Sequence, residues 1–314
     1  MSNQNNQEKF KTMIGGQALI EGIMMRGPEK QSIVVRSPEG LVVKTEPLKL
    51  DTKKNPILKW PLIRGVVNFG GSMVQGVKAL MYSAEFFPEE QEEPSKFDRW
   101  LEKKIGSEKM EKLIIYVAAV LGIAMSVGLF ILLPTFVAGL IPGLDGRFFA
   151  RNLVEGLCKI VIFMGYMILV SKMKDMKRVF SYHGAEHKTI RCYEALLPLT
   201  VENVRCQTRK HPRCGTSFLL VVICISILVG AVIRVDNTFV RMGLHLLLLL
   251  PIVALSYELN RWVGRHDNWF TRILTAPGQW MQNFTTYEPD DSMIEVAITA
   301  LQEVLPEQEG ADQW

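Results

Sequence analysis

Apolar positions gather in the middle of the chain, where residues 113–144 contain no charged side chain. As a helix, such a run is long enough to cross a hydrocarbon layer of about 30 Å. Further apolar runs follow at 153–171, 216–235 and 239–259. We therefore predict an α-helical integral membrane protein with about four transmembrane helices, in a membrane domain over residues 113–259.

The first 55 residues form a separate cytoplasmic segment with a different pattern. Its Gly-rich motif, residues 15–28, places four glycines in an apolar stretch too short to span a membrane, which indicates tight turns or close backbone approach. Residues 32–36 and 41–45 are β-rich and are joined by Ser37-Pro38-Glu39-Gly40, which predicts a small β hairpin unit. Glu21 and Arg26 of the motif are candidate functional residues, or a salt-bridged pair that orders a turn.

Residues 56–112 combine an amphipathic helix, predicted from Pro61 to about Phe86, with a charged linker. One stripe of this helix consists of small residues that permit close helix packing (Gly65, Ser72, Gly76, Ala79 and Ser83). The wide apolar face fits a helix in the membrane interface, and it fits equally an ordinary core helix of a cytoplasmic domain.

The loop over residues 172–215 is rich in histidine and separates the second and third apolar runs. Met176, Phe180, His183, His187, Ile190, Glu194 and Leu197 share one helical face. This spacing predicts that the second transmembrane helix continues into the cytoplasm with its histidines on the packed side, and that Pro198 ends it.

The C-terminal tail, residues 260–314, begins with a turn-rich stretch from Asn260. A helical apolar stripe follows between Met293 and Leu305, and Ser292 with Glu295 matches a capping box. We expect a short helix that docks on the cytoplasmic domain.

The distribution of Lys and Arg predicts the topology. Basic residues crowd the segment before the first run and the 172–215 loop, whereas the other two connections carry Arg147 and Arg151, then Arg234 and Arg241. The positive-inside rule then places both termini and the His-rich loop in the cytoplasm of a multi-pass plasma-membrane protein. Residues 1–10 are polar, so no cleavable signal peptide is expected. The net charge of +4 reflects this topology, and no motif indicates nucleic acid.

Two histidines four residues apart, His183 and His187, carry the strongest chemical signal. They lie one helical turn apart and can reach one divalent metal ion, for which zinc is the expected species. Glu186, between them, is placed to act on a metal-bound water as the catalytic residue. The order His-x-x-Glu-His inverts the zinc-peptidase signature. His211, Cys214 and Glu258 are the candidates for a third ligand, and the spacing does not choose among them.

Isolated polar residues inside the apolar runs have structural interpretations. His245 is expected to hydrogen-bond a neighbouring helix, and Glu155 and Lys159, four residues apart, can pair with each other. The five cysteines, an odd number with Cys192, Cys206 and Cys214 on the reducing side, do not describe a disulfide framework.

Four motifs resemble the YqhQ family of bacterial membrane proteins: residues 15–28, 182–188, 211–217 and 288–291. The resemblance covers about residues 13–305. It implies a bacterial plasma-membrane location and a domain of unknown function that is commonly labelled a predicted metal-dependent enzyme, with no reaction assigned.

Several functions remain open from the sequence. The first is a zinc-dependent hydrolase that acts on a peptide or lipid-linked substrate at the cytoplasmic membrane face. The second is a scaffold or assembly factor with a structural metal site, for which His183, His187, His211 and Cys214 could supply four ligands. The third is metal or lipid transport, which would need oligomerisation, and the histidines could also be packing residues. The partners expected are the lipid bilayer and membrane proteins or further copies of the chain.

Overall fold

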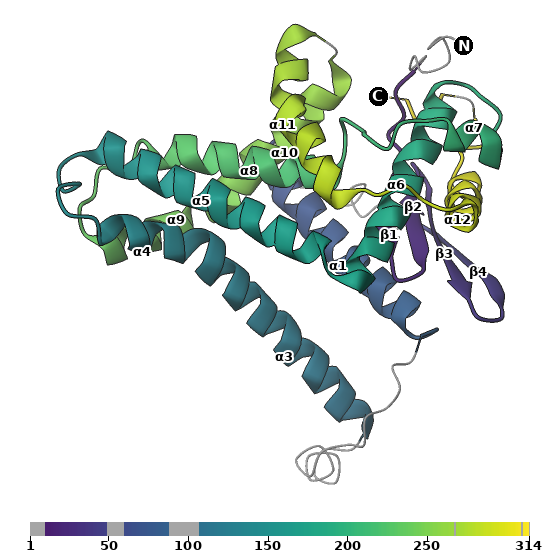
Figure 1. The fold of residues 1–314 in the computed structure, drawn as a ribbon, viewed down its shortest axis with the longest axis horizontal. Helices are drawn as coiled ribbons and strands as arrows, with labels where there is room; N and C mark the ends of the chain where they lie inside the picture. Colours follow the sequence, from purple (N-terminus) through teal and green to yellow (C-terminus); the bar gives the residue numbers. More distant parts are fainter. Residues whose placement is uncertain (1–9, 49–59, 88–106, 267, 309, 314) are drawn as a thin grey trace. The chain divides into compact units, whose positions relative to one another are not determined.

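The computed structural model describes residues 10–48, 60–87, 107–266, 268–308 and 310–313. It is mostly helical, with a single four-stranded sheet among the described residues (Figure 1). The chain divides into two compact units. Unit 1 comprises residues 1–87, 165–226 and 250–314, and unit 2 comprises residues 88–164 and 227–249.

The sheet in unit 1 is an antiparallel meander in which each strand pairs with the next. Its strands are β1 (Gly15–Leu19), β2 (Gly22–Arg26), β3 (Lys30–Ser37) and β4 (Gly40–Pro47). The predicted hairpin is β3–β4, with Ser37 opposite Gly40. The Gly-rich motif forms the other hairpin, and its two-residue turn holds Glu21 at a φ of 48°. The N-terminal unit is therefore a sheet twice as large as the predicted hairpin.

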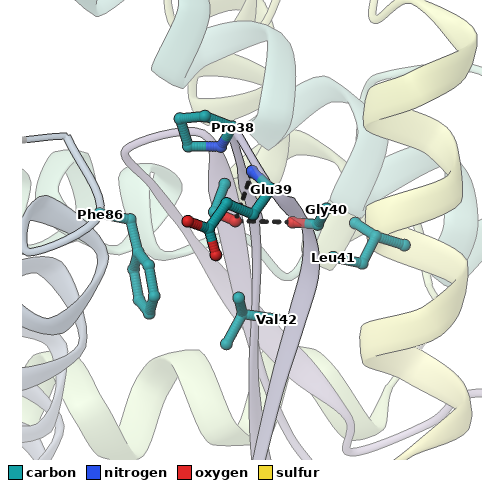
Figure 2. Close-up of a pocket in the computed structure, with 7 residues that line it drawn as sticks. Pro38, Glu39, Gly40, Leu41, Val42 and Phe86 are labelled. Carbon is teal, nitrogen blue, oxygen red and sulfur yellow. Dashed lines mark hydrogen bonds between the residues drawn. The ribbon is translucent and has the colours of Figure 1, made fainter.

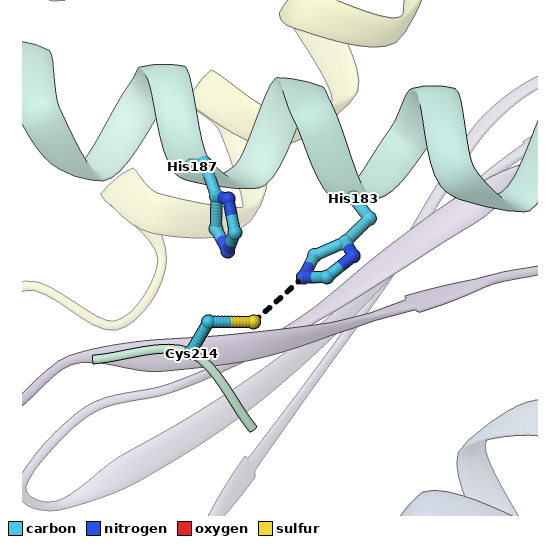
Figure 3. A group of neighbouring side chains, drawn as sticks. All are labelled: His183, His187 and Cys214. Carbon is cyan, nitrogen blue, oxygen red and sulfur yellow. Dashed lines mark hydrogen bonds between the residues drawn. The ribbon is translucent and has the colours of Figure 1, made fainter. Parts of the chain in front are cut away.

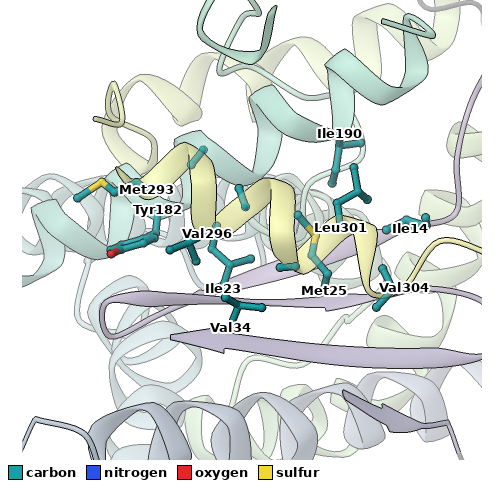
Figure 4. Close-up of a cluster of buried hydrophobic side chains, with 13 residues drawn as sticks. Ile14, Ile23, Met25, Val34, Tyr182, Ile190, Met293, Val296, Leu301 and Val304 are labelled. Atoms are coloured by element: carbon teal, nitrogen blue, oxygen red, sulfur yellow. The ribbon is translucent and has the colours of Figure 1, made fainter. Parts of the chain in front are cut away.

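Two helices cover one face of the sheet, α6 (Lys174–Glu194) and α12 (Asp291–Gln302). Their apolar side chains and those of the strands form one buried cluster (Figure 4), which contains Ile14, Ile23, Met25, Val34, Tyr182, Ala185, Ile190, Met293, Val296, Ala297, Ala300, Leu301 and Val304. The prediction of a C-terminal helix docked on this domain is confirmed. Its N-cap is Asp290 and not Ser292, because the Asp290 carboxylate reaches the Met293 N–H over 3.0 Å.

The opposite face of the sheet packs against α1 (Ile63–Ala84), which confirms the amphipathic helix predicted over this region. Ala79 of α1 joins a buried cluster with side chains from the strands (Leu19, Met24, Ile33 and Val35). The buried positions of α1 are Gly65, Gly76, Ala79 and Ser83, four of the five residues of the predicted small stripe, whereas Ser72 is exposed. Small side chains there allow the helix backbone to approach its neighbours closely.

The apolar runs form helices of unequal length. Of the described residues, Tyr116–Gly139 and Phe148–Ser171 are long and apolar enough to cross a membrane. The first comprises the end of α3 (Ser107–Val127), a π-helical segment (Gly128–Leu132) and α4 (Leu133–Gly139), and the second is α5. The fourth run is bent by 46° between α9 (Thr238–Leu247) and α10 (Leu249–Arg265), and this pair could form one further span. The third run, α8 (Gly215–Gly230), is shorter.

The prediction that the second long helix continues to the histidines is wrong. Helix α5 ends at Ser171, and α6 begins at Lys174 after Met173, whose extended backbone has a ψ of 136°. Helix α6 then ends at Glu194, before Pro198, because Leu196 adopts a left-handed φ of 54° that a helix does not tolerate. A short helix, α7 (Val201–Arg205), follows. The histidines therefore lie on a separate helix with its own orientation.

The prediction of a turn-rich stretch from Asn260 is also wrong. Helix α10 runs on to Arg265, and α11 (Trp269–Thr285) follows it. Asn268 and Thr271 form a reciprocal capping box at the start of α11. This signal of a helix start was overlooked among the surrounding polar and aromatic residues. Pro277 lies inside this helix.

In unit 2, Glu155 of α5 is fully buried with two partners from α9. Its carboxylate accepts hydrogen bonds from Arg241 Nε over 2.6 Å and from His245 Nε2 over 3.1 Å. The prediction that His245 bonds a neighbouring helix is confirmed. These contacts give His245 and Glu155 a structural role, because each provides a hydrogen-bond partner for a polar atom of the other that is buried away from water.

Candidate metal centre

Helix α6 presents His183 and His187 one turn apart, facing Cys214, which directly precedes α8 (Figure 3). One ligand atom from each of the three residues lies within 4.8 Å of the others. His183 Nε2 is 3.1 Å from Cys214 Sγ, and the two imidazole centroids are 4.3 Å apart. Among the described residues, this group satisfies the geometric requirement for a shared metal ion.

The remaining ring nitrogens of both histidines are held by backbone carbonyl groups. His183 Nδ1 donates to the Thr285 carbonyl over 2.8 Å, and His187 Nδ1 donates to the Arg209 carbonyl over 2.6 Å. A carbonyl oxygen can only accept, so each Nδ1 carries a proton. The Nε2 atoms are therefore the nitrogens available as metal ligands, and the backbone bonds fix the orientation of both rings.

Cys214 is buried, and its sulfur accepts from the Thr216 N–H over 3.4 Å. Burial raises the pKa of the thiol, but His183 and His187 outweigh burial and hold that pKa well below its usual range. Burial lowers the pKa of His183, but Cys214, Glu186 and the Thr285 carbonyl together outweigh burial and raise that pKa to about 9. A lowered thiol pKa favours the thiolate, which is the form of cysteine that binds a metal.

Glu186 is buried beside the histidines, and its Oε1 accepts the Gly16 N–H over 2.9 Å. Burial raises the pKa of Glu186, an effect that His187 and His183 offset only in part. A Cβ atom at Gly16 would lie 3.1 Å from the Glu186 carboxyl carbon and 2.6 Å from the Met24 carbonyl oxygen. The close backbone approach predicted for the Gly-rich motif is therefore the contact between β1 and the candidate catalytic carboxylate.

His211 lies next to the group but points elsewhere. Its ring centroid is 5.6 Å from that of His187, and its Nε2 is 3.3 Å from Glu194 Oε2. Burial and the neighbouring Arg213 lower the pKa of His211 well below its usual value. Glu194 is fully buried and also accepts from Arg213 and from the Thr12 N–H. The structure thus gives His211 a carboxylate partner in place of a position in the three-residue group.

The other sequence candidates lie apart from this group. Glu258 forms a bidentate ion pair with Arg64 of α1. Glu21 pairs with Arg178 and accepts from the Tyr182 hydroxyl over 3.2 Å. Arg26, which was the alternative partner for Glu21, instead donates to Gln75 Oε1 over 3.3 Å.

Residues that the sequence did not single out complete the surroundings of the group. Gln282 of α11 accepts the His211 N–H over 2.8 Å and donates to the His211 carbonyl over 2.7 Å. The carbonyl groups of Thr285 and Arg209 orient His183 and His187. These contacts use backbone atoms or join segments far apart in the sequence. Only the density of glycines near Gly16 gave a signal in advance.

A separate hollow of about 430 Å³ lies at the β3–β4 turn (Figure 2). Pro38, Glu39, Leu41, Val42 and Phe86 are among its lining residues, and the Ser37 hydroxyl braces the turn by donating to the Gly40 carbonyl over 3.0 Å. None of the candidate site residues lines this hollow, so it offers no alternative centre for the chemistry.

The donor set of the three-residue group is one that a zinc ion could accept. Two imidazole nitrogens and one thiolate match the ligand preference of zinc, and a tetrahedral ion bound by three protein ligands keeps one open position. The protonated Nδ1 atoms and the lowered pKa of Cys214 fit this assignment, since metal ligands must offer lone pairs.

The fold and this site define a mostly helical protein with apolar helices of membrane-spanning length, a small antiparallel sheet and a buried His-His-Cys group. Residues 60–307 match the family model described as "Protein of unknown function (DUF1385)". The chain is 34% identical over 305 residues to the "Uncharacterized protein YqhQ" of Bacillus subtilis (strain 168). The matched region covers 96% of this chain and 94% of that relative. The chain belongs to this bacterial family, as its four motifs predicted. No solved structure matches it.

Proposed function

We propose that this protein is a zinc-dependent hydrolase of the bacterial plasma membrane that acts on a peptide or lipid-linked substrate at the cytoplasmic face. One observation carries the proposal: His183, His187 and Cys214 offer three converging ligand atoms, and the buried carboxylate of Glu186 lies on the same turn of α6. Three protein ligands leave a coordination position for water or substrate, whereas a closed structural site has four.

Four membrane spans with both termini in the cytoplasm complete the proposal. The two long apolar helices and the bent α9–α10 pair support three spans, and α8, although shorter, carries no charged side chain. The excess of Lys and Arg between α5 and α8 supports the orientation. Helix α6 lies in that basic segment and so faces the cytoplasm in this topology.

In this site His183, His187 and Cys214 would hold the zinc ion. A bound zinc ion supplies Lewis acidity, which polarises a carbonyl and lowers the pKa of water toward about 7. Glu186 has the properties of a general base and acid. Burial raises the pKa of its carboxyl group, which favours uptake of a proton from water, and the Gly16 N–H fixes the orientation of the carboxylate.

The alternative is a structural zinc site in a membrane scaffold. The 5.6 Å separation of the His187 and His211 rings favours it, because a turn of the His211 side chain could add a fourth ligand. The bond between His211 Nε2 and Glu194 opposes it in the present arrangement.

Metal analysis of the detergent-purified chain tests both hypotheses. We expect about one zinc per chain in the parent, loss of zinc in the His183→Ala, His187→Ala variant, and retention in the His211→Ala variant. Loss of zinc from His211→Ala would favour the structural site, and a parent that holds no zinc after purification with zinc supplied would refute both.

Hydrolysis needs a separate test, for which Glu186→Gln is the appropriate variant. It keeps the shape of the side chain and removes its ability to take a proton, so it should hold zinc and retain uncleaved substrate. Mass spectrometry of the peptides and lipids that copurify should show a species enriched in Glu186→Gln over the parent. Identical copurifying material in the two zinc-loaded proteins would contradict a hydrolase.

A further inference from the structure

Helix α11, which the sequence did not predict, has three distinct faces around its axis. One face is buried within unit 1 and consists of Thr271, Gly278, Met281, Gln282 and Thr285. A second is apolar and exposed, with Trp269 at 73%, Ile273 at 60% and Trp280 at 56% relative exposure. Their spacing of four and seven residues places these three on one stripe. The third face is polar, with Arg272, Gln279 and Asn283.

The apolar stripe is unlike an ordinary water-facing surface. Two tryptophans and an isoleucine lie in a row on it, and Phe270, 44% exposed, contacts the Trp269 ring beside the start of the stripe. Contiguous apolar surface of this kind marks an interaction site. Tryptophan is enriched where a bilayer meets water, because its ring is apolar while its N–H remains hydrated.

The position of α11 in the chain identifies what covers the stripe. Helix α10 is the second half of the bent pair that can form a span, and three residues separate its end at Arg265 from Trp269. Trp262 near that end stacks on His266 with centroids 4.7 Å apart and contacts Phe270 at 6.2 Å. A helix that begins so soon after a span ends must start at the depth of the lipid headgroups.

Basic side chains lie where anionic headgroups would meet them. Arg261 and Arg265 are in the last turn and a half of α10, and Arg272 is on the flank of α11 next to the apolar stripe. Long basic side chains beside an exposed apolar stripe are the pattern of helices that lie in the plane of a membrane surface.

We propose that α11 lies in the interfacial layer of the lipid bilayer, with Trp269, Ile273 and Trp280 against the acyl chains and Arg272 among the headgroups. This inference rests on the membrane location proposed above. The partner of the stripe is the bilayer itself, and not another protein.

This placement ties the candidate metal centre to the membrane surface. The buried face of α11 contacts residues of and around the candidate metal centre. The Thr285 carbonyl accepts from His183, and the Gln282 side chain accepts the His211 N–H. Gly278 packs against Ser217 so closely that a Cβ atom at Gly278 would lie 2.6 Å from the Ser217 side chain. Because the opposite face of the same helix rests on lipid, the site is held at a fixed depth near the headgroups. It thereby favours substrates that are themselves bound to or embedded in the bilayer.

Fluorescence quenching in vesicles tests the orientation of α11. In the first variant of the full chain, every tryptophan except Trp280 is replaced by Phe. In the matched variant Trp280 is replaced by Phe as well, and Gln279→Trp places the single indole on the polar face of α11. Both are reconstituted in phosphatidylcholine–phosphatidylglycerol vesicles with brominated acyl chains. We expect the lipid bromine to quench the Trp280 chain roughly threefold more than the Gln279→Trp chain, and aqueous iodide to show the reverse order.

Each outcome has a defined meaning. Strong iodide quenching of the Trp280 chain without bromine quenching overturns the proposal, and so does resistance to both quenchers, which indicates a protein cover. Flotation with the vesicles is measured in parallel: a chain that does not float refutes the proposed membrane location, whereas one that floats with an unquenched Trp280 refutes only the placement of α11. In the otherwise unchanged chain, single Trp269→Phe and Trp280→Phe substitutions should each remove part of the bromine-quenched emission, and the absence of any loss also overturns the proposal.

Discussion

The backbone N–H of Gly16 donates a 2.9 Å hydrogen bond to the Glu186 carboxylate, across 170 residues of sequence. The bond joins the edge strand β1 to the helix that carries His183 and His187. It also explains why glycine stands at this position, because a side chain there would meet the Met24 carbonyl, the Met25 sulfur and the Glu186 carboxyl group at once.

Gly16→Ala should therefore destabilise the protein, while its neighbour Gly15→Ala should not. The new methyl group at Gly16 would lie 2.6 Å from backbone, which cannot move cheaply, whereas a Cβ at Gly15 meets nothing within 4 Å. We expect a loss of about 1–3 kcal/mol in the free energy of unfolding for Gly16→Ala and less than about 0.5 kcal/mol for Gly15→Ala, measured by denaturant titration. Equal effects of the two substitutions would contradict the contact.

Zinc should stabilise the folded chain through Cys214. A ligand that binds only the folded state at 100 times its dissociation constant adds about 2.7 kcal/mol, which raises the thermal midpoint measurably. The increase should vanish in Cys214→Ala and persist in Cys206→Ala, since Cys206 is exposed and lies outside the three-residue group. The midpoint with zinc and with a chelator, measured for the three proteins, checks this. A zinc-dependent increase that survives Cys214→Ala would refute the thiolate ligand.

Glu186→Gln should change how the stability of the metal-free protein depends on pH. Burial raises the folded-state pKa of Glu186 above its unfolded value of about 4.5, so between these two values the folded state binds more protons. Stability is then lost as pH rises from about 4.5 through the folded pKa, and ionised Glu186 remains unfavourable above it.

Because the glutamine side chain carries no charge, the Glu186→Gln variant should be more stable than the parent at neutral pH, by on the order of 1 kcal/mol, and the two should converge toward about pH 4. Denaturant unfolding of the chelated proteins across this range measures the difference. Glu303→Gln, at an exposed position on the surface of the same unit, is the control and should follow the parent. A constant difference at every pH would show that the effect does not come from ionisation.

Arg213→Met should be among the most damaging single substitutions near the site. It removes the cation that faces the fully buried Glu194 and leaves the carboxylate only its bonds to His211 and the Thr12 N–H. Removing one partner of a buried ion pair costs about 3–5 kcal/mol. Arg205→Met removes a similar ion pair with Asp291, but both side chains are more than half exposed, so only a small change is expected. Unfolding of both variants under the same conditions makes the comparison, and a similar loss from each would refute the importance of burial here.

Local patterns in the sequence predicted several elements correctly. The β3–β4 hairpin, α1 and α12 each have a periodicity that reflects one buried face, and the His-x-x-Glu-His spacing put both histidines on one side of a helix. The break at Met173 and the capping box of α11 were missed. At both places a few local contacts decide whether the chain forms a helix or a turn. The periodicity of apolar residues, averaged over a window of the sequence, does not contain this information.

By itself, the sequence determined the long apolar helices, the presence of a candidate metal motif and the family, because hydropathy and residue spacing are properties of neighbouring positions. Only the tertiary structure brought Cys214, of the three candidate ligands, close to His183 and His187. It also paired His211 with Glu194 and Glu258 with Arg64, and it brought Gly16 to Glu186. Histidine, cysteine and carboxylate side chains are all competent ligands, so their chemistry does not choose among them. The choice follows from burial and from backbone contacts between segments far apart in the chain, which exist only once the chain has folded.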